Sequence, residues 1–322
     1  MRLLKLVPDN TNIDFMRWRN VALVLSIVIT LASIALVAAR GLNLGVDFVG
    51  GQMIRASFDR PVAIEDVRRI VGGLELGEAS IQDLGESKTL SIRMGPPPGG
   101  ESASNAAASR VRTALSARYP GTKFAVDTVS PKVSSELYRS GSWSITLAMI
   151  GIALFIWFRF EWQFGVGALV TLFHDVCMTM GFFSLTQLEF NLNVVAAILT
   201  IVGYSLNDTV VIYDRIRENL RKYRKMEIVP LLNLSLNETL SRTMVTSLSI
   251  MLALLALLLI GPEVIFGLTI AILLGIFVGT YSSIYISAPI LVWLRVSGDS
   301  FLPRTSVGHG GAERVTSLNE GA

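Results

Sequence analysis

Long apolar runs alternate with one long polar segment along the chain. A run of roughly 17–25 predominantly apolar residues is long enough to form a membrane-spanning helix. Such runs, or close approaches to them, occur at residues 21–39, 145–158 (with a start nearer 141), 164–185, 192–213, 239–260 and 264–294. The pattern predicts a polytopic α-helical membrane protein with six transmembrane helices. The last run is long enough to tilt, break or extend beyond the bilayer.

The first apolar run also has features of a cleavable signal peptide. It follows a polar, basic arm at residues 1–20 and ends in the small residues Val37, Ala38 and Ala39. A signal peptide has a core of about 7–15 apolar residues, whereas the run at 21–39 approaches the length of a spanning helix. We therefore expect the first run to be an uncleaved transmembrane helix.

Residues 40–138 have the composition of a soluble domain. Strand-like and amphipathic helical runs follow one another in the order strand, helix, strand, strand, helix, strand, and a stretch rich in Pro and Gly at 95–100 is typical of a loop. This order predicts an α+β domain with the ferredoxin-like βαββαβ arrangement. The expected strands are 54–58, 79–84, 89–94 and 123–129, and the expected helices are 62–74 and 106–118.

The distribution of basic residues predicts how the chain crosses the membrane. Short cytoplasmic loops of membrane proteins carry an excess of Lys and Arg, and the turns at 186–191 and 261–263 carry neither. This rule predicts cytoplasmic termini and an extracytoplasmic domain between the first two helices. The segments assigned to the cytoplasm are the arm at 1–20, Arg159, a basic loop at 214–238 and a tail at 295–322, which we expect to be disordered.

The composition excludes several classes of function. Hydrophobic residues make up 51% of the 322 positions and charged residues only 16%, against about 25% charged residues in soluble proteins. The net charge of +3 requires no nucleic acid partner, because cytoplasmic loops of membrane proteins are themselves basic. The single cysteine, Cys177, excludes an intramolecular disulfide and a cysteine-based metal cluster. We expect neither a metal nor a cofactor.

Two charged residues lie in the fourth and fifth apolar runs, at comparable depth. Asp208 lies roughly 21 Å beyond Val194, and Arg242 lies roughly 27 Å before Ile260, at about 1.5 Å per residue. An arginine side chain can bridge the difference of about one helical turn. A charge in the middle of a span costs roughly 2.5 to 3.5 kcal/mol, and such residues mark ion or proton pathways. We expect Asp208 and Arg242 to be partners across adjacent antiparallel helices.

Polar residues extend this pair into two stripes. Thr200 and Tyr204 lie on the same face of the fourth span as Asp208, with Ser205 and Asn207 beside them. The two stripes predict one hydrated seam. The alternative is that these groups only hold the helices together, at about 0.6 kcal/mol per hydrogen bond. The stripe on the fifth span consists of Thr239, Arg242, Thr243, Thr246 and Ser249.

The pair would act as a proton switch. Arginine keeps its charge, so Asp208 is the group that titrates. Burial favours the neutral carboxylic acid, whereas a nearby guanidinium favours the carboxylate. Movement of Arg242, or entry of water, would therefore load or release a proton.

Other candidate residues have more ordinary interpretations. His174 has no second ligand at metal-binding spacing, so we expect a hydrogen bond between packed helices. Its neighbour Asp175 is a candidate auxiliary member of the relay. Asp214 lies beside Arg215 and Arg217 at the edge of the membrane, where a solvated ion pair is expected.

A glycine-rich motif, Gly45-Val-Asp-Phe-Val-Gly-Gly51, joins the first span to the first strand. It lacks the Lys-Ser/Thr and the following helix of a phosphate-binding loop. Gly50 and Gly51 permit a close backbone approach or a positive φ. We interpret Gly45, Asp47, Gly50 and Gly51 as a structural junction at the start of the external domain.

The chain resembles the SecF family, and several motifs carry the resemblance. SecF is the smaller member of the SecD and SecF pair that assists the bacterial Sec translocase, and it is related to the resistance-nodulation-division transporters. By position in these motifs, Asp208 is similar to the family's essential intramembrane carboxylate. Arg242, 34 residues later, falls where the family keeps its functional arginine. The likeness covers Leu3 to about Leu294, and the matching motifs are the glycine-rich segment 45–51, Phe173-His-Asp-Val176, and residues 197–211 and 214–219.

The resemblance implies partners and an energy source. It implies a complex with SecD in the bacterial cytoplasmic (inner) membrane, and association with the channel of SecY, SecE and SecG and with YajC. It implies further that the proton-motive force, with protons as the coupling ion, pulls preproteins outward after the ATP-driven step. The short external domain fits SecF better than SecD.

Two other classes of function are considered beside this one. The first is a half-size, proton-driven exporter of small molecules or lipids from the same superfamily, and it stays open. The second is an intramembrane enzyme, which the sequence disfavours because neither His-Glu-x-x-His nor Gly-x-Ser-x-Gly occurs and no nucleophile accompanies His174. We therefore expect a transport protein and no enzymatic activity.

Overall fold

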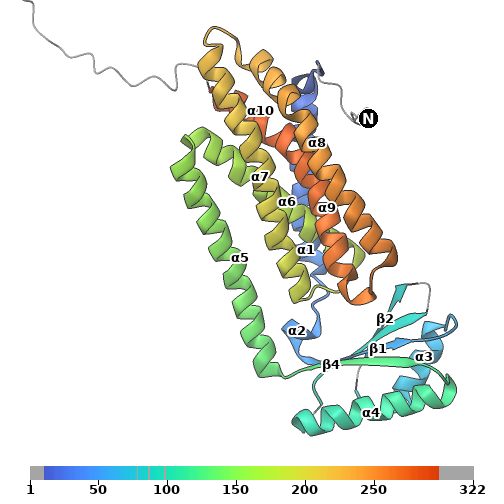
Figure 1. Ribbon diagram of the computed structural model, residues 1–322. Helices are drawn as coiled ribbons and strands as arrows, with labels where there is room; N and C mark the ends of the chain where they lie inside the picture. The colour runs from blue at the N-terminus through green and yellow to red at the C-terminus, as the bar shows by residue number, and fades with distance from the viewer. Residues whose placement is uncertain (1–10, 78, 86–87, 98, 297–322) are drawn as a thin grey trace, which may run out of the picture.

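The computed structural model describes residues 11–77, 79–85, 88–97 and 99–296. A long helical bundle carries a small α/β domain at one end, which we call the domain end; the other is the terminal end (Figure 1). Residues 1–10 and 297–322, which include much of the predicted arm and nearly all of the predicted tail, lie outside the described residues.

In the described part of the chain, six helical segments are long and apolar enough to cross a membrane, which confirms the prediction of six spans. Helix α1 follows a short 3₁₀ segment, Phe15–Trp18, and the last span runs from α9 through the π-helical segment Ser283–Ser287 into α10. The bounds are α1 Arg19–Arg40, α5 Pro131–Arg159, α6 Trp162–Thr186, α7 Leu192–Lys222, α8 Ile228–Ile260, α9 Phe266–Ser282 and α10 Ala288–Trp293.

Helix α5 begins earlier than the hydropathy pattern predicts. Its first residue is Pro131, whose fixed φ suits the first helical position, and the Ser130 hydroxyl accepts a hydrogen bond from the Val133 N–H at 3.4 Å. Residues 131–138 therefore belong to this helix and not to the external domain. Their polar composition concealed the helix, because an apolar run reveals only the part of a helix that lies in the membrane.

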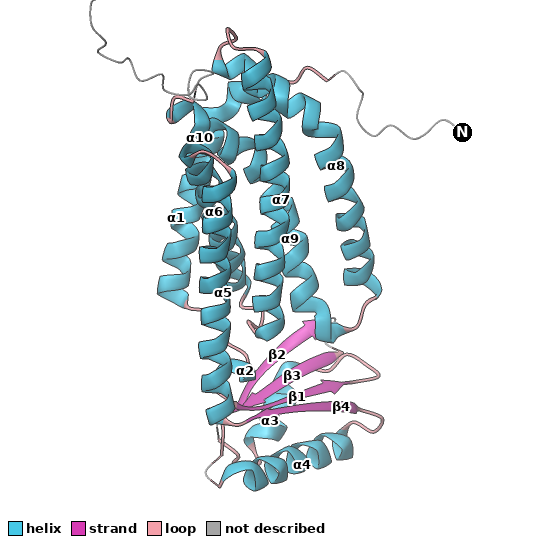
Figure 2. Ribbon diagram, turned by 60° about the vertical axis from the view of Figure 1, so that its left-hand side comes forward, coloured by secondary structure: helices cyan, strands magenta, loops and turns pink. Residues whose placement is uncertain are grey.

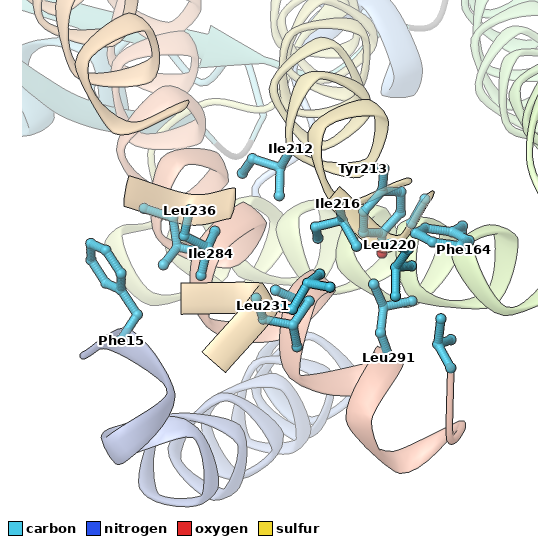
Figure 3. Close-up of a cluster of buried hydrophobic side chains, with 14 of the residues drawn as sticks. Phe15, Phe164, Ile212, Tyr213, Ile216, Leu220, Leu231, Leu236, Ile284 and Leu291 are labelled. Carbon is cyan, nitrogen blue, oxygen red and sulfur yellow. The ribbon is translucent and has the colours of Figure 1, made fainter. Parts of the chain in front are cut away.

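Most of the predicted basic loop at 214–238 is also helical, because α7 continues to Lys222 and α8 starts at Ile228. Ile212, Ile216 and Leu220 recur every fourth residue and are buried against Leu231 and Leu236 at the terminal end (Figure 3). This spacing places one apolar stripe on a helix whose basic residues occupy the other faces. The true connection between the two helices is residues 223–227.

The external domain has the predicted order of strands and helices. Its strands are β1 Gly51–Ser57, β2 Ala79–Gly85, β3 Thr89–Met94 and β4 Lys123–Val129, and its helices are α3 Ile64–Gly72 and α4 Gly100–Arg118. The sheet order is β2-β3-β1-β4 with every neighbouring pair antiparallel. This is the ferredoxin-like arrangement that the sequence predicts.

One face of this sheet carries the core of the domain. Helices α3 and α4 cover the face turned away from the bundle (Figure 2). Ile54 of β1 pairs with Ile92 of β3, and both are fully buried with Val67 of α3 and Val111 of α4. The same alternation leaves the other face free to meet the domain end of the bundle.

Helices α7 and α9 pack closely in the middle of the bundle. Gly275 and Gly279 of α9 face Ile201 and Ser205 of α7, and a Cβ atom built on Gly275 would lie 2.3 Å from the Ile201 side chain. The two glycines thus permit the approach of two backbones, as a small-xxx-small pattern does in membranes. This contact fixes the position of α7, the helix that carries Asp208.

Candidate functional site

Asp208 is buried in the middle of the bundle, on the side of α7 that faces α8. Its side chain is 6% exposed, and Oδ1 accepts a hydrogen bond from the Thr243 hydroxyl at 2.9 Å. Oδ2 is equally buried and has no hydrogen-bond partner among the described residues. A carboxylate in this position is short of donors, which favours either a proton on Oδ2 or a water molecule beside it.

Arg242 is too far from Asp208 for the predicted direct ion pair, although its positive charge still acts on that carboxyl group. Among the described residues no carboxylate lies within 4.0 Å of its guanidinium, and its side chain is exposed. The reason is helical geometry: Thr243 faces α7, so Arg242, about 100° away around the helix, points to the outside of the bundle. Arg242 is nonetheless the neighbour of the residue that binds Asp208.

The other residues of the two polar stripes divide into a buried and an exposed group. The Tyr204 hydroxyl is 2.8 Å from that of Ser247 on α8, which is 2.8 Å from the Thr280 hydroxyl on α9. Tyr204 and Thr243 therefore connect helices. Thr200 and Thr246 are exposed and donate to carbonyl oxygens of their own helices, and Asn207 is exposed on the same outer face of α7.

Sequence reasoning missed Ser247 and Thr280 as members of this network. Serine and threonine are common in packed membrane helices, so the residue type alone gives no signal. The spacing of Ser247 four residues after Thr243 would have placed both on one face.

Asp175 of α6 contacts α7 one helical turn away from Asp208, and it also contacts α9. Its Oδ2 accepts hydrogen bonds from Ser205 at 2.6 Å and from Ser282 at 2.9 Å. Its Oδ1 is 2.9 Å from Nδ1 of His174. His174 thus makes a hydrogen bond, as predicted, but its partner is the adjacent residue and not another helix.

The glycine-rich motif binds the start of the external domain to the start of α7. A short helix, α2 (Val46–Val49), lies within the motif. The Asp47 carboxylate accepts a hydrogen bond from the Leu192 N–H at 3.0 Å, and the Gly45 N–H donates to the Phe190 carbonyl at 2.8 Å. The motif therefore caps the helix that carries Asp208.

The glycines of the motif are required by geometry. Gly50 and Gly51 have φ values of 79° and 107°, which confirms the predicted positive φ. A Cβ atom on Gly45 would lie 2.5 Å from Oε1 of Glu189, so a larger residue would displace that side chain. We call this contact between segment 41–51 and the loop 187–191 the junction.

Glu189 is the titratable group of the junction. Burial raises the pKa of its carboxyl group, and the guanidinium groups of Arg55 and Arg93 on the sheet partly offset the rise. Arg55 is held by Asp127 at 2.7 Å, and Arg93 donates to the Leu44 carbonyl oxygen. The sheet, the segment after α1 and the α6–α7 loop therefore form one polar contact region.

Ion pairs hold the terminal end of α5, α6 and α7. Asp214 pairs with Arg159 at 2.9 Å, and both side chains are nearly half exposed, as expected of a solvated ion pair. Arg217 pairs with Glu161 at 3.2 Å. A cavity of about 540 Å³ is lined by Arg159, Asp214 and Arg217 together with Glu218, Arg221 and Lys222.

Two models of protein families match the chain. Residues 112–297 match the family described as "Protein export membrane protein SecD/SecF, C-terminal". Residues 35–62, which contain the junction motif, match the family described as "SecD/SecF GG Motif". The first match alone covers more than half of the chain.

Named relatives and solved structures are similar over nearly the whole chain. The protein translocase subunit SecF of Rickettsia rickettsii is 44% identical over 89% of this chain and 94% of its own length. The SecF subunit of Rickettsia prowazekii is 43% identical over 89% and 93%. The crystal structure of SecDF, a translocon-associated membrane protein from Thermus thermophilus, superposes with a TM-score of 0.82 at 34% identity. The match covers 90% of this chain but only 40% of the SecDF chain.

Proposed function

The chain belongs to the SecD/SecF family of protein-export membrane proteins, as a SecF-type translocase subunit, and from this premise we propose that it couples proton movement to preprotein export. The family membership makes it a multi-pass membrane component of Sec export, a transport part and not a catalytic enzyme. The proposed finer function is a proton relay at Asp208 that works in complex with SecD and drives late steps of export.

The observation that carries this proposal is the half-satisfied Asp208 carboxyl group. Oδ1 is held by Thr243, whereas the buried Oδ2 has no partner in the described part of the chain. Burying an ionised carboxylate without donors is costly, so the site favours the protonated form until a donor or a positive charge arrives. A group in this state can bind and release a proton as its neighbours move.

The outward position of Arg242 supports the proposal that a second membrane chain completes the site. An arginine facing lipid at mid-depth costs roughly 2.5 to 3.5 kcal/mol on insertion scales. The exposed Thr200, Asn207 and Thr246 lie on the same outer surface of α7 and α8. We assign this surface to SecD, whose carboxylates would pair with Arg242. The SecDF relative has more than twice the length of this chain, which leaves room for such a partner.

The junction supplies a route from the relay to the external domain. Asp47 binds the first residue of α7, Gly45 binds Phe190 two residues before it, and Asp208 lies further along the same helix. A shift or tilt of α7 would therefore move the start of the domain directly. One charge that crosses 100 mV carries about 2.3 kcal/mol, which biases a two-state equilibrium roughly fiftyfold.

The remaining features of the proposal concern place and partners. The likeness to SecF subunits supports a place in the bacterial inner membrane. The basic residues at the terminal end of the bundle support cytoplasmic termini and an external α/β domain. The channel of SecY, SecE and SecG, together with YajC and the translocating preprotein, is proposed as the wider assembly. The likeness to SecF subunits supports this assignment.

An export assay tests the proposal. Membrane vesicles that contain the full chain and SecD are given a proton-motive force, and the rate of preprotein translocation is measured. Asp208→Asn should abolish the stimulation that the chain provides, with unchanged membrane insertion and unchanged co-purification of SecD. Asp214→Asn, at the solvated terminal end, is the matched control and should keep the stimulation. Full stimulation by Asp208→Asn would refute the relay.

A further inference from the structure

A second carboxylate is buried in the bundle, and the relay described above does not use it. Asp175 of α6 has no exposed surface. Its three hydrogen-bond partners come from three helices, because Ser205 belongs to α7, Ser282 to α9 and His174 to α6 itself. Both serine hydroxyls donate to Oδ2, so an ionised Asp175 would receive its remaining hydrogen bond from the imidazole Nδ1–H.

His174 is the only cationic group available to neutralise this carboxylate among the described residues. The sole ion pair of Asp175 in that part of the chain is the contact with His174 at 2.9 Å. The neighbouring tyrosines are engaged with other groups: Tyr281 bonds to Ser26 of α1, and Tyr213 bonds to the Ser287 carbonyl oxygen. Cys177 on α6 itself, Tyr204 and Asp208 on α7, and Tyr285 in the π-helical segment are further titratable side chains within the bundle. The other charged residues of the helices packed against α6 lie towards the helix ends, among them Arg19 and Arg40 on α1, Glu136, Arg139 and Arg159 on α5, and Asp214, Arg215, Arg217 and Glu218 on α7.

The His174 side chain lies beside an apolar cavity. The ring is 5% exposed and lines a cavity of about 260 Å³ between α1, α6 and α10, whose walls are mostly aliphatic and aromatic side chains such as Leu23, Phe173 and Ile290. An isolated charge is costly in such a place, but a paired imidazolium and carboxylate are together neutral.

Counting protons shows what this arrangement can do. With Nδ1–H donating to Asp175, a neutral His174 leaves the pair with a net charge of −1. A further proton on Nε2 gives an imidazolium–carboxylate pair with no net charge. The low-polarity surroundings favour the neutral total, so the pair is suited to hold one exchangeable proton.

Asp208 is one helical turn from a residue that binds this pair. Ser205, which donates to Asp175, is three residues before Asp208 on α7, and side chains at that spacing are about 5–6 Å apart at Cβ. Two carboxylates near one helical turn repel when both sites are negative. Loss of a proton from Asp208 therefore favours a proton on the His174–Asp175 pair, and a proton on Asp208 disfavours it.

The contacts of this pair also reach a part of the last span that is not regular α-helix. Ser282, a donor to Asp175, is followed by the π-helical segment Ser283–Ser287, and Ser283 is 3.0 Å from Thr209, the residue after Asp208. π-helical turns are frequent at functional sites. Asp175 thus contacts the residue before this irregular segment, and Thr209, the neighbour of Asp208, contacts its first residue.

We propose that His174 and Asp175 form a second proton-binding site whose occupancy is opposite to that of Asp208. This inference uses one part of the proposed function, namely that Asp208 gains and loses a proton. The exchanged proton resides on Nε2 of His174, and Asp175 positions the ring and supplies the countercharge.

Nitrogen NMR of His174 tests the proposal without a transport assay. The chain contains only two histidines, His174 and His309, so ¹⁵N-histidine labelling of the full-length His309→Gln protein in lipid bilayers gives a single imidazole. The expected spectrum changes from imidazolium to neutral imidazole as the pH rises. Where Asp208 is ionised, its charge favours a proton on His174, so Asp208→Asn should lower the midpoint by about one pH unit, which is about tenfold in proton affinity.

Two further variants separate a proton site from a purely structural contact. Asp175→Asn removes the countercharge, so His174 should stay neutral across the pH range in which the protein is folded. Thr171→Val alters a buried hydroxyl one turn earlier on α6 and should leave the midpoint unchanged. Ser282→Ala replaces Asp175→Asn if that variant fails to fold. It removes one hydrogen-bond donor from the Asp175 carboxylate, so a proton binds more readily to Asp175 itself and the affinity of His174 for a proton should fall.

The outcomes distinguish this proposal from the proposed function. A His174 ring that stays neutral at every pH in the reference protein would overturn the second site. A midpoint that Asp208→Asn does not move would overturn the coupling. Neither result depends on preprotein export, so a failure of Asp208→Asn to impair export would be recognised separately.

Discussion

The hydrogen bond between Asp47 and α7 is the strongest structural reason to regard the junction as a mechanical link. Asp47→Ala removes the acceptor of the Leu192 N–H at 3.0 Å and a negative charge at the helix N-terminus. Loss of a capping side chain costs about 0.5–2 kcal/mol, and loss of a charge that complements the helix dipole costs about 0.3–1 kcal/mol. We therefore expect the first turn of α7 to open more easily by about 1–2 kcal/mol.

Hydrogen–deuterium exchange at the Leu192 amide measures this change in the purified full chain. A loss of about 1–2 kcal/mol corresponds to exchange that is about 5–30 times faster. Asp47→Asn keeps an acceptor and removes the charge, so it should show the smaller part of the effect.

The matched control is Asp66→Ala, which removes an exposed ion pair with Arg69 at 3.6 Å on α3. Pairs of this kind contribute about 0–1 kcal/mol, and this one is remote from α7. The control should leave exchange at Leu192 unchanged. Exchange in Asp47→Ala within about twofold of the unaltered protein would refute the claim that the motif caps α7.

Three further changes have defined outcomes. Glu189→Gln should flatten the dependence of stability on pH, because burial raises the pKa of Glu189 in the folded protein. The stability that protonated Glu189 contributes is present at low pH and is lost as the pH rises from the ordinary carboxyl range through the raised pKa. Thermal unfolding measured across that pH range checks this. Gly275→Val should destabilise the protein by about 1–3 kcal/mol through overpacking against α7. Gly203→Ala, whose added Cβ atom meets nothing within 4 Å, should not destabilise it. Chemical or thermal unfolding curves of the two variants measure the difference. Tyr204→Phe should cost only about 0.6 kcal/mol by the same measurement, the average for one hydrogen bond between membrane helices.

Apolar periodicity was sufficient to predict the architecture of the chain. The six spans and the ferredoxin-like domain follow from run length and from the change in period between residues 40 and 138. The helix ends beyond the membrane did not follow. Helix α5 starts at Pro131 and α7 continues to Lys222, because a cap and an amphipathic stripe act where hydropathy is low.

The candidate site was predictable in its residues but not in their pairing. Charge in an apolar run singled out Asp208 and Arg242, and spacing placed them at similar depth. Which residue of α8 faces α7 depends on the rotation of the whole helix, which the contacts of all its neighbours determine. That rotation brings Thr243 to Asp208 and turns Arg242 outward. The junction between Asp47 and Leu192 joins residues that are far apart in sequence, so no local pattern could reveal it.

The central claim is that Asp208 carries protons that drive export, and proton flux tests it most directly. Vesicles that contain the full chain, SecD and the Sec channel are loaded with a pH-sensitive dye, and a proton gradient is imposed in the presence of a translocating preprotein. The account predicts proton entry that depends on the preprotein and is abolished by Asp208→Asn but not by Asp214→Asn. Equal proton entry with Asp208 and with Asn at that position would contradict the account.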